Sequence, residues 1–158
     1  FAVTDTALDR VTIGMAKVST SAHEAYDLDI LKPGKDIVVV NTSRQIATAK
    51  ALARQMADMG YTKPAARNDV KVLGKQALGM FLVGTDAMNA SKYISEHDQK
   101  IANKLAYVMA GGDLSEPTLV SEQYLLDLER EAFLSLTGER KTLERLQHMI
   151  QKGKPLRN

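Results

Sequence analysis

The chain has 158 residues, of which 44% are hydrophobic and 25% are charged, and its formal net charge at pH 7 is +2. A chain of this length and composition is typical of a globular protein with its own hydrophobic core. The absence of cysteine excludes disulfides and thiolate chemistry and is consistent with a reducing, cytoplasmic location. The sequence contains neither a basic run interleaved with aromatic residues nor an apolar run of membrane-spanning length, so we expect no nucleic-acid face and no membrane span.

Two helices are predicted near the start of the chain. The apolar residues of 4–18 indicate a first helix, although several of them are β-branched, which weakens helix formation. A second, short helix is predicted from Ser21 to about Leu28, because Ser21 and Glu24 have the spacing of a capping box.

Residues 36–40, with the sequence Asp-Ile-Val-Val-Val, form the one strand-like run in the chain. Four of the five are β-branched, and the run follows a turn predicted at Pro33 and Gly34. A single strand leaves its edges unpaired, so this segment is either a loop that passes through the core or a strand whose partners lie in a portion of the protein outside this chain.

A strong helix is predicted from the polar residues 41–43, which can cap it, to Met59. Three cations, Arg44, Lys50 and Arg54, lie on its outer face. Such a group can bind a phosphate, for example one of coenzyme A. More often such a group is a solvated helix face.

The loop Tyr61–Asp69 is the best internal boundary in the sequence. Three glycines follow at intervals of five residues, at Gly74, Gly79 and Gly84. Their flanking residues do not fit the phosphate-binding P-loop, which requires Gly-Lys-Ser/Thr at its end. Close approach of helices is the alternative explanation for these glycines.

A helix is predicted to begin at Ser95 and to end at Gly111, with Asp98 placed to complete a capping-box-like start. His97 stands next to Asp98, but neighbouring residues on a helix point about 100° apart and do not face each other. We therefore expect these two residues to act separately in the first turn rather than as a catalytic dyad.

The next helix is predicted from a cap at Ser121 to Gly138, where a left-handed residue is expected. On a helical wheel, Glu129 falls between Leu136 and Phe133, inside the apolar arc. A buried carboxylate there must be paired, hydrogen-bonded or protonated. It would be either a perturbed acid in a site or one half of an internal salt bridge or helix cap.

A last short helix is predicted at Lys141–Gln151, stopped by Gly153 and Pro155. The expected fold class is therefore mainly α, with about six or seven helices and the short strand-like segment at 36–40. No metal-binding, nucleophile-elbow or dinucleotide-binding motif occurs in the sequence. The residues alone thus assign no catalytic function.

Four blocks of sequence, in this order, resemble the C-terminal part of bacterial 3-hydroxyacyl-CoA dehydrogenases that carry a fused enoyl-CoA hydratase, or crotonase-like, region. These blocks are Lys17–Ala25, Tyr93–Asp113, Val120–Leu136 and Gln151–Asn158. The resemblance covers most of the chain. It implies that residues 1–62 form the closing helical part of a crotonase-like domain and that residues 63–158 form a helical C-terminal extension.

The resemblance further implies a longer enzyme of fatty-acid β-oxidation that oxidises 3-hydroxyacyl-CoA with NAD and hydrates enoyl-CoA as a second activity. Its NAD-binding and catalytic motifs would lie upstream, so no catalytic, cofactor-binding or metal-binding residue is transferred to this chain. By itself the segment is expected to be inactive, to bind no cofactor and to serve as packing, as an interface with the upstream domains or as one wall of the acyl-CoA tunnel.

Because such a segment would expose apolar surface that once faced its neighbours, self-association, most simply as a dimer, is also expected. The alternative is an autonomous helical module that binds a protein partner through an apolar groove.

Overall fold

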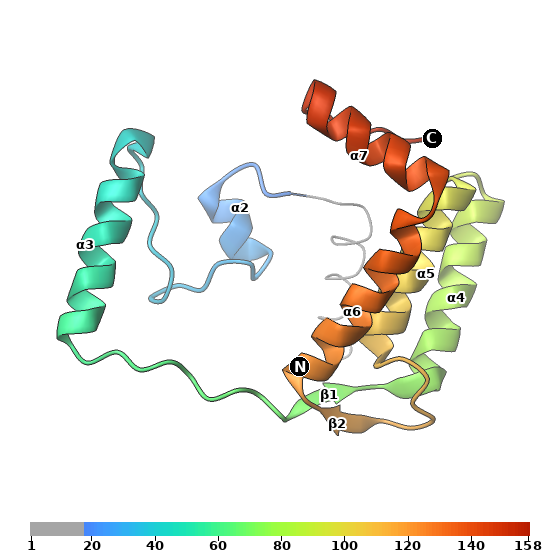
Figure 1. Cartoon of the computed structure of the whole chain (residues 1–158), viewed down its shortest axis with the longest axis horizontal. Helices are drawn as coiled ribbons and strands as arrows, with labels where there is room; N and C mark the ends of the chain where they lie inside the picture. The colour runs from blue at the N-terminus through green and yellow to red at the C-terminus, as the bar shows by residue number, and fades with distance from the viewer. Residues whose placement is uncertain (1–17) are drawn as a thin grey trace. The chain divides into compact units, whose positions relative to one another are not determined.

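The computed structural model describes residues 18–158 (Figure 1). The chain divides into two compact units, Phe1–Ala65 and Ala66–Asn158, which meet within the loop Tyr61–Asp69. The described residues are mainly helical, as predicted, with six α-helices and one two-stranded sheet. Residues 4–17 of the helix expected at 4–18 lie outside the described part of the chain.

The first unit contains α2 (Ala22–Asp27), a 3-10 turn (Thr42–Arg44) and α3 (Gln45–Asp58). Ser21 caps α2 as predicted, because its side chain accepts a hydrogen bond of 3.1 Å from the Glu24 N–H. None of the α3 residues is buried within the described structure.

Residues 36–40 form a loop, so the strand predicted as one of the two alternatives was wrong; the loop is mostly exposed and does not pass through the core. The side chain of Asp36 instead closes a turn, accepting a hydrogen bond of 2.7 Å from the Lys32 N–H. β-branched residues favour extended backbone, but a strand also needs a partner within hydrogen-bonding distance.

The second unit is a bundle in which α5 contacts both α4 and α6 (Figure 1). The β1–β2 pair lies at one end of the bundle and α7 crosses the other end. The elements are β1 (Val70–Val72), α4 (Gly74–Ala90), α5 (Glu96–Ala110), β2 (Thr118–Val120), α6 (Glu122–Thr137) and α7 (Arg140–Lys152). None of the helices in the described part of the chain is long and apolar enough to cross a membrane.

The small sheet is antiparallel, with Val70 opposite Val120 and Val72 opposite Thr118. It positions Val72, which is only 2% exposed, against the end of α5. There Gly111 adopts φ +87, as the predicted helix stop requires, and a Cβ at this position would lie 2.5 Å from Val72 Cγ2. Glycine is therefore needed at 111 both for its backbone conformation and for space.

The core of the bundle is built largely from small side chains. No side chain larger than alanine, except Val72 and His97, is buried among the described residues of this unit. The buried alanines lie on α4, α5 and α6: Ala77, Ala106, Ala110 and Ala132. Small residues let helix backbones approach closely, but they bury little apolar surface.

Two predictions about glycine differ from the structure. A Cβ added at Gly79 or Gly84 would meet nothing within 4 Å, so these residues do not mediate close helix packing in the described structure. Gly74 does permit a close approach, but to a loop, because a Cβ at this position would lie 2.7 Å from the backbone carbonyl oxygen of Leu114. Gly138 ends α6 with φ −74 rather than in a left-handed conformation, because α7 begins immediately after it.

Candidate functional site

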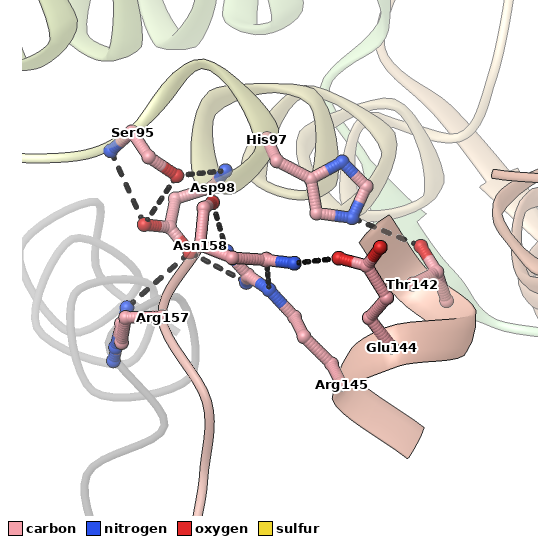
Figure 2. Close-up of polar contacts among 8 residues, drawn as sticks. All are labelled: Ser95, His97, Asp98, Thr142, Glu144, Arg145, Arg157 and Asn158. Carbon is pink, nitrogen blue, oxygen red and sulfur yellow. Dashed lines mark hydrogen bonds and ion pairs between the residues drawn. The ribbon is translucent and has the colours of Figure 1, made fainter. Parts of the chain in front are cut away.

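The most highly connected polar cluster lies where the start of α5 meets α7 and the last residues of the chain (Figure 2). Its base is the capping box predicted from sequence. The Ser95 side chain accepts a hydrogen bond of 3.1 Å from the Asp98 N–H, and the Asp98 carboxylate accepts one of 3.2 Å from the Ser95 N–H. These bonds satisfy backbone donors that the first turn of a helix leaves free and fix the Asp98 carboxylate in place.

Arg145 of α7 connects this capping box to the end of the chain. Its Nη1 donates to Asp98 Oδ1 at 2.7 Å, and its Nε donates to Asn158 Oδ1 at 2.8 Å. Its Nη2 also donates to the Asn158 backbone carbonyl at 3.2 Å. The Asn158 amide in turn donates to Glu144 Oε2 at 2.8 Å, and Arg157 approaches Asp98 at 3.5 Å. We call the group formed by Ser95, Asp98, Glu144, Arg145 and Asn158 the clasp.

The electrostatics of the clasp favour ionised, paired groups. Burial by itself would raise the pKa of Asp98, but hydrogen bonds from Arg145 and Ser95 outweigh burial and hold the pKa below its usual value. The side chains of Arg145 and Asp98 are 17% and 12% exposed. A carboxylate held this way neither gives up nor takes a proton near neutral pH, so the clasp is suited to holding elements together rather than to acid–base chemistry.

His97 lies beside the clasp and is 5% exposed. Its Nε2 is hydrogen-bonded to Thr142 Oγ1 of α7 at 3.0 Å. Burial first, and then the charge of Arg145, lowers the pKa of His97 below its usual value of 6.5. As expected from their adjacent positions, His97 and Asp98 contact different partners and form no dyad.

A groove of 590 Å³ lies along α4, α5 and α6. Leu78 and Leu82 of α4 give it an apolar wall, while Lys100 and Lys104 of α5 and Glu131 of α6 add charges of both signs. Lys100 is already paired with Glu139 at 2.8 Å. The groove has the mixed lining of a surface that can accept an amphipathic group, but it carries no arrangement of nucleophile, base and orienting group.

The three cations predicted as phosphate ligands are all exposed, and none forms an ion pair with another residue in the range 18–158. Lys50 and Arg54 lie four residues apart on α3 and so share a face. Arg44 belongs to the preceding 3-10 turn. Phosphate binding by these three residues stays a prediction.

Glu129 was predicted to be a buried carboxylate, and the structure corrects this: its side chain is exposed. Helix α6 packs through a narrow stripe that includes Leu128 and buried Ala132, whereas Phe133 is 57% exposed. The apolar arc on the helical wheel is therefore wider than the face of α6 that is buried, and Glu129 lies in the part of the arc that is open to solvent.

Sequence reasoning missed Arg145, Thr142 and Asn158, which carry the contacts between α7 and α5. No spacing rule links residues that lie on separate helices. The one available signal was that the capping-box residue Asp98 is a carboxylate that needs a cationic partner, and that Arg145 had no predicted role. Across residues 18–158, no cluster of three or more histidine, aspartate or glutamate side chains could hold a metal ion.

Comparison with known proteins gives one informative similarity. The chain is 52% identical over 147 residues to a protein of Bacillus subtilis (strain 168) named "Probable 3-hydroxyacyl-CoA dehydrogenase". The chain is homologous to part of this protein. The match includes 93% of the chain, which spans only 18% of the length of its relative. No protein-family model matches the chain, and no solved structure matches it.

Proposed function

We propose that this chain is a structural and interface segment of a fatty-acid β-oxidation enzyme. The whole enzyme would oxidise 3-hydroxyacyl-CoA to 3-ketoacyl-CoA with NAD in the cytoplasm. The observation that supports this is the 52% identity, over nearly the whole chain, to a protein named as a 3-hydroxyacyl-CoA dehydrogenase. Identity at that level over 147 residues is far above what unrelated helical segments share.

The role within that enzyme is inferred from the character of the polar cluster. The clasp joins elements through ionised, mutually satisfied groups, and His97 is buried against Thr142. The nicotinamide, when bound to the other part of the enzyme and not to this chain, would supply the hydride chemistry. We also propose that the whole enzyme hydrates enoyl-CoA in a crotonase-like region. Residues 1–62 would form the closing part of that region, and residues 63–158 would form a helical extension of it.

The test compares two proteins: the product of the complete reading frame and the 158-residue chain alone. We expect the complete protein to reduce NAD in the presence of a short 3-hydroxyacyl-CoA and to hydrate crotonyl-CoA, and we expect the 158-residue chain to do neither. A complete protein without NAD-dependent oxidation of 3-hydroxyacyl-CoA of any chain length would refute the proposal. Activity of the 158-residue chain by itself would refute the structural role.

Assembly of the complete enzyme into a homo-oligomer is also proposed, since large apolar side chains on several helices are exposed, among them Met80 and Phe133. Light scattering of the complete enzyme is the direct measurement, and a strictly monomeric mass at high concentration would rule it out.

The exposed apolar side chains also favour a second function, an autonomous helical module that binds a separate protein. The two functions differ in the gene that encodes the chain. A reading frame that begins close to Phe1 would support the autonomous module and exclude the enzyme segment.

A further inference from the structure

Helix α7 is oriented opposite to the usual rule for an amphipathic helix. Its sequence has a well-separated apolar stripe, which in a globular protein normally faces the core. In this structure the polar residues Thr142, Arg145 and His148 are partly buried, whereas the large apolar residues are exposed. The outer apolar face of α7 consists of Leu143 (52% exposed), Leu146 (42%), Met149 (47%) and Ile150 (85%).

The reason for this orientation is that α7 is held to the bundle by polar side chains. Arg145 binds Asp98 and Asn158, and Thr142 binds His97 (Figure 2). The ion pair between Lys100 and Glu139 fixes the residue just before α7 in the same way. Rotating α7 to bury its apolar stripe would break the bonds of Arg145 and leave the Asp98 carboxylate without its main partner, which opposes the rotation.

A face of four large apolar side chains, exposed to water on a helix that a polar clasp holds to the bundle, is unfavourable unless another surface covers it. More than four fifths of the length of the dehydrogenase relative lies outside the region matched by this chain. That length is far more chain than is needed to supply one complementary apolar surface.

We propose that the outer apolar face of α7 docks onto an apolar surface of the remaining part of the same enzyme chain, and that the clasp holds α7 ready for this contact. The inference relies on the proposed function only in taking the chain as a segment of a longer protein. The proposed contact lies within one polypeptide rather than between two copies. The two observations that support it, the clasp and the additional chain length of the relative, both concern a single polypeptide.

Thiol labelling tests this contact, since the chain has no cysteine of its own. Ile150→Cys places a thiol on the outer apolar face, and Lys152→Cys, also exposed and two residues further along the same helix, is the matched control because residues two apart on a helix do not share a face. Both variants are made in the complete protein and in the 158-residue chain, and alkylation of each site is followed by peptide mass spectrometry. We expect the Ile150→Cys site to react at least tenfold more slowly than the Lys152→Cys site in the complete protein, at every protein concentration, and the two sites to react at similar rates in the 158-residue chain.

Each other outcome overturns the proposal in a recognisable way. Equal reaction of the two sites in the complete protein would mean that nothing covers the face. Protection that increases with protein concentration would assign the face to a second copy. Protection already present in the 158-residue chain would assign it to residues of this chain. Because labelling does not depend on catalysis, an inactive complete protein that still protects the Ile150→Cys site would refute the proposed activity and leave the docking intact.

Discussion

The guanidinium of Arg145 donates a 2.7 Å hydrogen bond to the carboxylate of Asp98, a residue 47 positions earlier in the chain. Asp98 is at the same time the third-position residue of the capping box of α5, in which it accepts a hydrogen bond from the Ser95 N–H. One carboxylate therefore stabilises the first turn of one helix and holds the side chain of another, so the start of α5 and the position of α7 depend on each other.

Replacing Arg145 tests this dependence. Arg145→Met removes the guanidinium and leaves the Asp98 carboxylate, with a side chain 12% exposed, lacking its main partner. Leaving a buried charge unpaired typically costs about 3 kcal/mol of unfolding free energy, and Arg157, which lies 3.5 Å from Asp98, offsets part of this cost. We expect a loss of up to that size in chemical denaturation.

Arg145→Lys should recover only part of this loss, because an ammonium cannot reproduce the fork of three bonds to Asp98 and Asn158. The matched control is Arg140→Met on the same helix, since Arg140 pairs with Glu144 on the surface and such pairs contribute little. An Arg145→Met chain as stable as the Arg140→Met chain would show that the clasp does not hold α7.

The buried His97 makes stability depend on pH. Burial and Arg145 lower the pKa of His97 in the folded chain, so the unfolded chain binds this proton more readily. The contribution of His97 to stability is complete above a pH of about 6.5, the ordinary histidine value, and is lost as the pH falls through the lower pKa of the folded chain. The charged groups that act on His97 are Arg145, Glu139, Lys141 and Lys100.

We therefore expect the free energy of unfolding to fall on acidification through the mildly acidic range, and we expect His97→Gln to flatten this slope. The exposed His23 provides the control variant His23→Gln, which should leave the slope as it is. Asp98, whose pKa is also lowered, contributes a separate loss at more acidic pH, below about 3.9. Identical slopes for the His97→Gln and unsubstituted chains would contradict the prediction.

A chain can need glycine for its backbone conformation or because a Cβ would have no space, and Gly111 and Gly153 allow these two reasons to be tested apart. Both have positive φ, at +87 and +64, but a Cβ would strike Val72 only at Gly111 and would meet nothing within 4 Å at Gly153. We expect Gly153→Ala to cost about 1 kcal/mol from backbone strain, and Gly111→Ala to cost about 1–3 kcal/mol more from overpacking.

Adding Val72→Ala to Gly111→Ala removes the side chain that the new methyl group would strike. Thermal unfolding of the four chains measures the coupling: the double variant should lose less stability than the sum of its two single variants. Purely additive losses would mean that the end of α5 and the β1–β2 pair are not in contact as described.

Lys50 and Arg54 give a test of the coenzyme A hypothesis. Because these two residues lie one turn apart on α3, whereas Arg44 belongs to the 3-10 turn before it, we expect Lys50→Ala and Arg54→Ala to weaken binding of crotonyl-CoA to the complete protein more than Arg44→Ala does. Loss of one charge-assisted bond to a phosphate corresponds to about a tenfold weaker affinity.

Titration calorimetry of the complete protein measures these affinities, with Lys63→Ala, in the loop after α3, as the control for a general change of charge. If all four variants bind crotonyl-CoA as the unsubstituted protein does, the outer face of α3 is a solvated surface and not a phosphate site.

The features predicted correctly from the sequence are those that depend on neighbouring residues. The caps at Ser21, Ser95 and Ser121 and the helix stop at Gly111 each follow from one turn of backbone and one side chain. Local hydrogen bonding determines them, so a single sequence is sufficient to find them.

The features that the sequence did not reveal depend on contacts between distant segments. The β1–β2 pair consists of strands of three residues each, too short for an alternating pattern to be visible. Periodicity correctly indicated an amphipathic α7, but it provided no means of telling which side faces the bundle, because that is decided by Arg145 and Asp98 on different helices. For the same reason the wheel placed Glu129 in an apolar arc without showing that only part of the arc is covered.

The alanine-built interior of the bundle also changes which mutagenesis experiment is informative. An alanine scan, the common way to map a core, is silent at Ala77, Ala106, Ala110 and Ala132, and would leave the helix contacts of this protein almost blank. A scan that enlarges each position, for instance Ala132→Leu, forces the helices apart and would reveal them. Substitutions at the buried positions of this bundle thus destabilise it by adding side-chain volume rather than by removing it.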